Sequence, residues 1–157
     1  MQNQTYRAII IDDKPDARSV LRRLIEQYCP QFDICAEAGT VPEALEDIQR
    51  CRPAVVFLDV GLRQGSGFDI LDAYPHPDFK VVFITAYDHF AVKAFKYRAL
   101  HYLLKPIDPQ DLIAATAELH VPQHYWPEYE RLQQTLKNNR ASKLLLPSLR
   151  GAVVVDA

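Results

Sequence analysis

Short apolar runs alternate with amphipathic stretches over residues 7 to 120. The apolar runs predict five β-strands, at 7–12, 32–38, 54–59, 80–86 and 101–105. Between them, apolar positions recur three and four residues apart, which is the spacing of one helix face. This spacing predicts five helices, at 15–28, 40–51, 68–74, 88–98 and 109–119.

Residues that favour helix starts stand before several of these stretches. Thr40 and Glu43 have the spacing of a capping box. Asp108 precedes Pro109, which occupies the first-turn position that proline favours. Asp88 is the expected cap of the helix at 88–98.

The strict alternation of strand and helix predicts the fold class. It is typical of an α/β protein with a doubly wound, five-stranded parallel sheet, right-handed crossovers and helices on both faces. In such sheets the ligand site lies beyond the carboxyl ends of the strands. The polar residues that end the apolar runs are Asp12, Asp13, Asp59, Thr85 and Lys105. The sequence therefore predicts a site at the strand tips.

The acids at these tips point to a metal. If the first and third strands are neighbours, their acids converge, and two carboxylates about 4 Å apart repel by roughly 4 kcal/mol at an effective dielectric of about 20. Mg²⁺ relieves this repulsion, since it prefers oxygen ligands. Lys105 adds a positive charge suited to a phosphoryl oxygen, and Thr85 adds a hydroxyl donor. One strand-end acid alone is more often a helix cap or a solvated turn, so the common edge carries the prediction.

Four stretches together resemble a known family: IIIDD, VVFLD, VVFITA and YLLKP. Over residues 7 to about 120 the chain is similar to the receiver domain of two-component response regulators, which has the CheY-like, flavodoxin-type fold. The resemblance implies a signalling phosphoacceptor that assists its own phosphotransfer and dephosphorylation, and not an enzyme. It also implies a sensor histidine kinase as partner.

The resemblance also implies roles for individual residues. Asp59 would accept the phosphoryl group from a phosphohistidine. Mg²⁺ would be held by Asp12, Asp13, Asp59 and the backbone carbonyl of Gly61. A nucleophilic carboxylate flanked by a cation agrees with the chemistry of phosphoryl transfer.

Further positions match the family's switch. Thr85 and Lys105 would contact the phosphoryl oxygens, and Tyr102 matches the aromatic residue that turns inward with the threonine. Tyr87, two residues after Thr85, is expected to shield the acyl phosphate from water. Arg63 stands where many receivers carry a proline.

The resemblance extends to the organisation of the whole chain. We expect a receiver domain at 5–122, a helical linker at 123–141 and, at 142–157, the beginning of a truncated LytTR-like DNA-binding domain with two short strands around a turn. DNA would be contacted only through the missing part of that domain. A homodimer is expected through the fourth helix, fifth strand and fifth helix.

A stripe on the fourth helix leaves two interpretations open. Phe90, Lys93 and Tyr97 share one side of that helix. They would form part of the dimer surface or face the protein core.

Composition agrees with a globular protein. Of the 157 residues 48% are hydrophobic and 24% charged, which fits one domain with a full core. The net charge of −2 lacks the basic excess of a module that grips nucleic acid by itself. No apolar run approaches the ~18 residues of a membrane span, and the first residues lack a secretion signal. We therefore expect a cytoplasmic protein without a membrane partner.

The three cysteines do not point to a further site. Cys29, Cys35 and Cys51 form neither a CxxC pair nor a zinc pattern and are expected to be buried thiols.

Two alternative functions remain. A haloacid-type aspartyl-phosphate hydrolase also combines a nucleophilic acid with magnesium, but Gly61 stands where its second acid would be. A receiver-like binding module that is never phosphorylated is the other alternative.

Overall fold

The computed structural model describes residues 5–120, 143–145 and 154–156. Its main sheet has five strands in the order β2-β1-β3-β6-β7, and all neighbouring strands run parallel. The strands are β1 (Tyr6–Ile11), β2 (Phe32–Ala38), β3 (Val55–Leu58), β6 (Lys80–Thr85) and β7 (His101–Leu104). The predicted doubly wound parallel sheet is confirmed.

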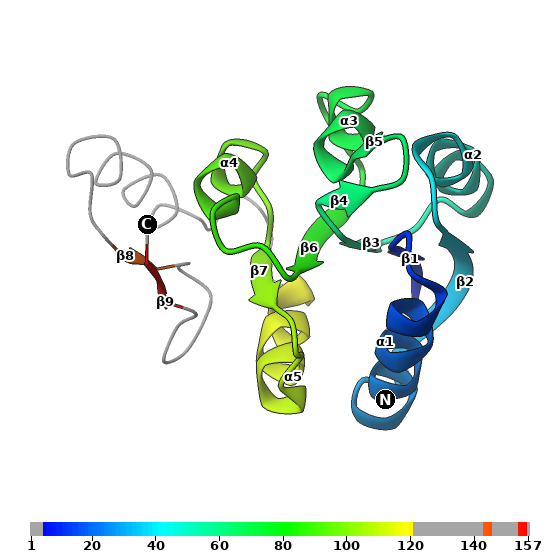
Figure 1. Cartoon of the computed structure of the whole chain (residues 1–157). Coiled ribbons are helices and arrows are strands. Elements are labelled where there is room, and N and C mark those ends of the chain that lie inside the picture. Colours follow the sequence, from blue (N-terminus) through cyan, green and yellow to red (C-terminus); the bar gives the residue numbers. More distant parts are fainter. Residues whose placement is uncertain (1–4, 121–142, 146–153, 157) are drawn as a thin grey trace.

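Helices cover both faces of this sheet (Figure 1). They are α1 (Pro15–Tyr28), α2 (Val41–Cys51), α3 (Gly67–Asp72), α4 (Ala91–Lys96) and α5 (Pro109–Ala117), followed by the 3₁₀ turn η1 (Glu118–His120). Helices α1 and α5 lie on one face, and α2, α3 and α4 on the other. The central strand β3 is buried along its whole length, which explains why its sequence is continuously apolar.

Local capping explains where most helices start. The Thr40 hydroxyl accepts a hydrogen bond from the Glu43 amide at 3.3 Å, and the Asp108 carboxylate accepts one from the Gln110 amide at 2.8 Å. Both caps agree with the prediction. Helix α3 has a capping box between Ser66 and Asp69 that sequence analysis missed.

The prediction for the start of α4 is wrong. The helix begins at Ala91 after Phe90, and Asp88 does not cap it. The His89 and Phe90 rings lie tilted with their centroids 4.1 Å apart, and residues 89–90 form a turn before the first helical residue. Phe90 occupies the N-cap position, and no side chain caps the helix there.

The loop after β3 contains an unexpected hairpin. Strands β4 (Gly61–Leu62) and β5 (Gly65–Ser66) pair antiparallel around Arg63 and Gln64. Gln64 has a φ of 63° and Gly65 a φ of 143°. The second value is readily adopted only by glycine, so Gly65 permits the tight turn.

The end of the chain contributes two further strands. As expected, β8 (Lys143–Leu145) and β9 (Val154–Asp156) are strands, and they pair antiparallel. The predicted linker helix at 123–141 and the turn between the two strands lie outside the described residues. In the part of the chain that is described, no helix combines the length and the apolar character needed to cross a bilayer.

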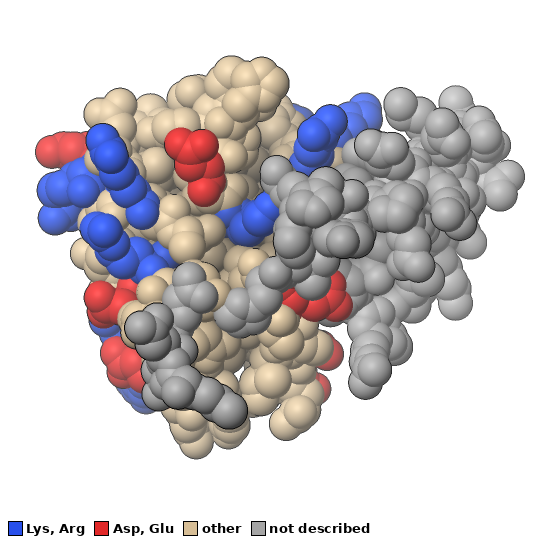
Figure 2. Space-filling model, turned by 180° about the vertical axis from the view of Figure 1, so that it is seen from behind, with Lys and Arg blue, Asp and Glu red and all other residues tan. Residues whose placement is uncertain are grey.

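The surface charge is mixed on the face seen from behind. Figure 2 shows basic and acidic side chains interspersed there, in agreement with the net charge of −2. A surface that binds nucleic acid by itself usually gathers basic residues on one side.

Candidate functional site

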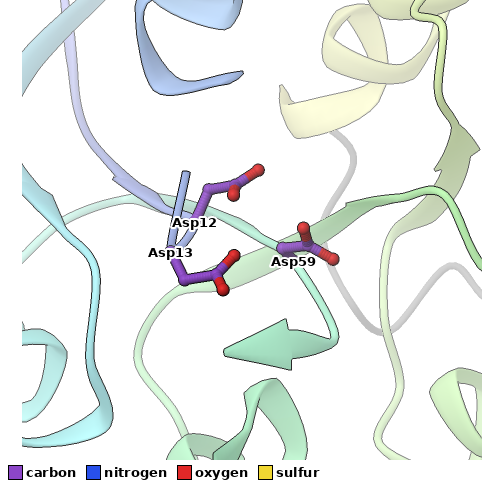
Figure 3. A group of neighbouring side chains, drawn as sticks. All are labelled: Asp12, Asp13 and Asp59. Atoms are coloured by element: carbon purple, nitrogen blue, oxygen red, sulfur yellow. The ribbon is translucent and has the colours of Figure 1, made fainter. Parts of the chain in front are cut away.

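The predicted acids meet at one edge of the sheet. Asp12 and Asp13 directly follow β1, and Asp59 directly follows β3. These strands are neighbours, and the Asp59 amide donates to the Ile11 carbonyl at 2.9 Å. One carboxylate oxygen from each acid lies within 4.8 Å of the others. Figure 3 shows the carboxyl groups of Asp12 and Asp13 extending toward the side on which Asp59 lies.

Lys105 joins this acidic group from a third strand. It follows β7, and its ammonium Nζ lies 2.6 Å from Asp12 Oδ2 and 3.0 Å from Asp59 Oδ2. Burial lowers the pKa of Lys105, but the hydrogen bonds to the two carboxylates and their charges outweigh burial, so the pKa is raised overall. Lys105 therefore stays protonated and offsets part of the negative charge.

Backbone amides satisfy further carboxylate oxygens. The Lys14 amide donates to Asp12 Oδ1 at 2.9 Å, and the Gly61 amide donates to Asp59 Oδ1 at 3.3 Å. Asp12 and Asp59 are 5% and 7% exposed, whereas Asp13 is half-buried. Buried carboxylates need compensating charge and hydrogen bonds, and the structure provides both.

The donor set fits a hard divalent cation. Three carboxylates face one lysine, so the group keeps an excess of negative charge. Mg²⁺ is bound in proteins by a few carboxylate oxygens together with water and phosphate oxygens. The acidic group thus has the charge and the ligand type of a magnesium site.

Thr85 and Tyr102 are linked through Tyr87. Thr85 ends β6 and is fully buried, and its hydroxyl accepts a hydrogen bond from the Tyr87 amide at 3.3 Å. Tyr102, on β7, is also fully buried, and its hydroxyl donates to the Tyr87 carbonyl. Burial raises the pKa of Tyr102, so its hydroxyl remains a donor. Both candidate switch residues therefore hold the backbone of the same residue.

Two glycines border Asp59. A Cβ on Gly61 would lie 3.1 Å from the Tyr87 ring, so this ring sits beside the residue whose amide binds Asp59. A Cβ on Gly67 would lie 2.5 Å from the Asp59 carbonyl oxygen and 2.9 Å from the Leu58 side chain. The sequence places Gly67 in the loop after Asp59, but its contact with the Asp59 carbonyl arises only when the hairpin folds back.

Sequence analysis also missed Arg18. Its guanidinium donates from Nη1 to the backbone carbonyl of Asp12 at 2.5 Å. The partner of Arg18 is a backbone carbonyl, which every residue has, so the pattern of side chains in the sequence could not identify this contact.

The stripe on α4 packs against α3. Phe90 and Tyr97 lie with ring centroids 6.0 and 5.1 Å from that of Phe68 in α3, and Lys93 Nζ lies 4.5 Å from the same ring. The Tyr97 hydroxyl also donates to Asp72 at 2.5 Å. Phe90 and Tyr97 are half-buried, whereas Lys93 is exposed. The stripe therefore packs against α3 with one part and stays at the surface with the other, so both interpretations apply to part of it.

The three cysteines are free, as expected. Cys29 and Cys51 are buried, but Cys35 is only half-buried, so that part of the prediction is wrong for one thiol. Cys35 lies in the edge strand β2, whose outer side is less covered.

Comparison with known proteins places the chain in a family. Residues 8–117 match the model of the response regulator receiver domain. The chain is 38% identical over 144 residues to an uncharacterized response regulatory protein of Vibrio cholerae, a match that covers 90% of this chain and 50% of the relative. It is 41% identical over 106 residues to the sensory transduction protein LytT of Enterococcus faecalis, covering 66% of this chain and 43% of that protein.

A solved structure agrees with the fold. A two-component response regulator of the LuxR family from Aurantimonas superimposes with a TM-score of 0.69 at 27% identity, covering 87% of this chain and 100% of that chain. The chain spans about half the length of the curated relatives it matches. On its sequence, its sheet order and the acids gathered at its strand tips, the chain belongs to the response regulator receiver domain family, whose members are signalling phosphoacceptors rather than enzymes.

Proposed function

We propose that Asp59 accepts a phosphoryl group from a phosphohistidine of a sensor histidine kinase, in a magnesium-dependent transfer. One observation carries this proposal: the buried Asp59 carboxylate lies 3.0 Å from the Lys105 ammonium and shares its surroundings with two more acids. Such a carboxylate is held in a fixed position at the edge of the sheet. A purely structural acid would not be placed among like charges.

The transfer exchanges one bond for another. An Asp59 carboxylate oxygen forms a bond to phosphorus while the nitrogen–phosphorus bond of the phosphohistidine breaks, and the bonding pair leaves with the imidazole. Lys105 then exchanges its bond to Asp59 for one to a phosphoryl oxygen. Mg²⁺, held by Asp12, Asp13, Asp59 and the Gly61 carbonyl, would neutralise charge on the phosphoryl oxygens.

The response to phosphorylation passes through Thr85. The phosphoryl group adds about −1.5 to −2 charge units and three strong acceptors. The Thr85 hydroxyl accepts a hydrogen bond from the Tyr87 amide. When this hydroxyl turns to donate to a phosphoryl oxygen, its hydrogen bond with the Tyr87 amide changes. Because Tyr102 donates to the carbonyl of Tyr87, a shift of this residue reaches β7. Thr85 and Tyr102 are thus the proposed switch pair.

The output we propose is transcription through a LytTR-type domain. Three of the relatives are named sensory transduction proteins LytT, and the strands β8 and β9 would open such a domain. The division into a receiver at 5–122, a linker at 123–141 and a partial DNA-binding domain at 142–157 belongs to this proposal. So does a homodimer through α4, β7 and α5.

Intact mass tests the central step. The whole chain is incubated with acetyl phosphate and Mg²⁺, and wild type is compared with Asp59→Ala and with Asp88→Ala, which removes an exposed acid. We expect one phosphoryl adduct on wild type and on Asp88→Ala and none on Asp59→Ala. An unmodified wild type would instead favour the unphosphorylated binding module. Multiple turnover of a phosphomonoester would favour the hydrolase.

A further inference from the structure

Arg18 contacts the acidic group from outside. It lies on α1, and its Nη1 donates to the Asp12 carbonyl at 2.5 Å while its Nε lies 3.5 Å from Glu37 Oε1. The side chain is only 21% exposed. The guanidinium thus joins α1 to the end of β1 and to β2.

This bond completes the fixation of Asp12. The Asp12 amide donates to the Ala38 carbonyl at 3.0 Å, and its carboxylate oxygens accept from the Lys14 amide at 2.9 Å and from Lys105 at 2.6 Å. The carbonyl is the remaining polar group, and Arg18 binds it. Since this carbonyl belongs to the peptide that joins Asp12 to Asp13, the bond orients that peptide and the direction in which Asp13 leaves the backbone.

The guanidinium is itself held in place. Glu37 also binds Arg22 at 2.7 Å, so its carboxylate is fixed by two arginines. Gly39 leaves the necessary room, because a Cβ there would lie 3.1 Å from Arg18 Nη1. An arginine can span two such partners through its planar fork, whereas lysine offers a single ammonium.

We infer that Arg18 is a positioning residue: it holds the Asp12–Asp13 peptide so that the Asp13 carboxylate is presented to Mg²⁺. This inference rests on the proposed function. Two effects of Arg18 have opposite signs, which makes the inference testable. Its positive charge repels a dication, so charge alone predicts tighter Mg²⁺ binding when Arg18 is neutralised, whereas positioning predicts weaker binding.

Mg²⁺ titration by calorimetry, on the whole chain and without a phosphoryl donor, separates these effects. The variants are Arg18→Met, which removes charge and bond, and Arg18→Lys, which keeps the charge. Arg23→Met is the matched control, since Arg23 lies on the same helix and is exposed. Because residues behind the direct ligands typically change metal affinity 10- to 100-fold, we expect both Arg18 variants to bind about 10-fold more weakly. Arg23→Met is expected to match wild type.

Tighter binding in Arg18→Met with unchanged binding in Arg18→Lys would overturn the inference. So would melting temperatures lowered without Mg²⁺ while the affinity stays the same, since that is the result of a merely structural role. Gly39→Ala keeps Arg18 but crowds its guanidinium, and a weakened affinity in this variant would support the inference even if Arg18→Met does not fold. Failure of wild type to bind Mg²⁺ or to be phosphorylated would count against the proposed function. Equal affinities in wild type, both Arg18 variants and Gly39→Ala would count against Arg18 alone.

Discussion

The buried imidazole of His101 should make folding stability depend on pH. His101 is the first residue of β7, at the end of the strand away from the acidic group, and it is fully buried. Burial lowers its pKa to about 4, because an imidazolium would lose its hydration inside the protein. In the unfolded chain histidine titrates near pH 6.5.

The magnitude follows from these two values. Between pH 6.5 and pH 4 the unfolded chain binds a proton at this position that the folded chain does not, so stability falls as the pH falls. With a folded-state pKa of about 4, the contribution of His101 decreases by about 2 kcal/mol between pH 7.5 and pH 5. This is a large part of the stability of an ordinary domain.

Urea unfolding at pH 7.5 and pH 5 measures this loss. His101→Gln cannot be protonated, so its free energy of unfolding should fall by about 2 kcal/mol less than that of wild type over the same interval. His89→Gln carries the same substitution at an exposed histidine and should behave like wild type. Subtracting the variants cancels the pH dependence of the acidic group. Equal losses in wild type and His101→Gln would refute the reasoning.

Three further predictions concern residues around Asp59. Tyr87→Ala removes the ring beside Gly61 and should speed loss of the phosphoryl group by up to about tenfold, which corresponds to ~1.4 kcal/mol of activation barrier. A dephosphorylation time course measures this rate, and an unchanged rate would contradict the shielding role. Gly67→Ala places a methyl group 2.5 Å from the Asp59 carbonyl oxygen. The clash should lower the free energy of unfolding, measured by chemical denaturation, by about 2 kcal/mol, which is more than alanine gains over glycine in a helix. A stabilised variant would show that the backbone moves to make room. Lys105→Met frees two carboxylates from their cation, and Mg²⁺ affinity measured by calorimetry should rise about tenfold, while a weaker affinity would indicate that Lys105 organises the acids.

Much of the fold and of the site follows from the sequence alone. Continuous apolar runs and helical spacing predict the alternation of strands and helices, because side-chain burial repeats with the period of each element. Parallel strands in such a sheet end at a common edge. The acids after the first and third apolar runs, and the lysine after the fifth, therefore had to meet there, and the structure brings Asp12, Asp13, Asp59 and Lys105 together.

Other features depend on contacts through space. The α4 helix starts at Ala91 after Phe90, whose ring packs against Phe68, although Asp88 has the residue type of a cap. The α4 stripe contacts Phe68. The helical period shows that the stripe residues share one side of the helix, but not which neighbour that side contacts. Arg18 reaches the site through the Asp12 carbonyl. Periodicity in the sequence shows which residues of an element are buried together, so it determined the sheet and its acidic edge. It does not show which groups of different elements meet. Those contacts were decided only when the helices packed against the sheet.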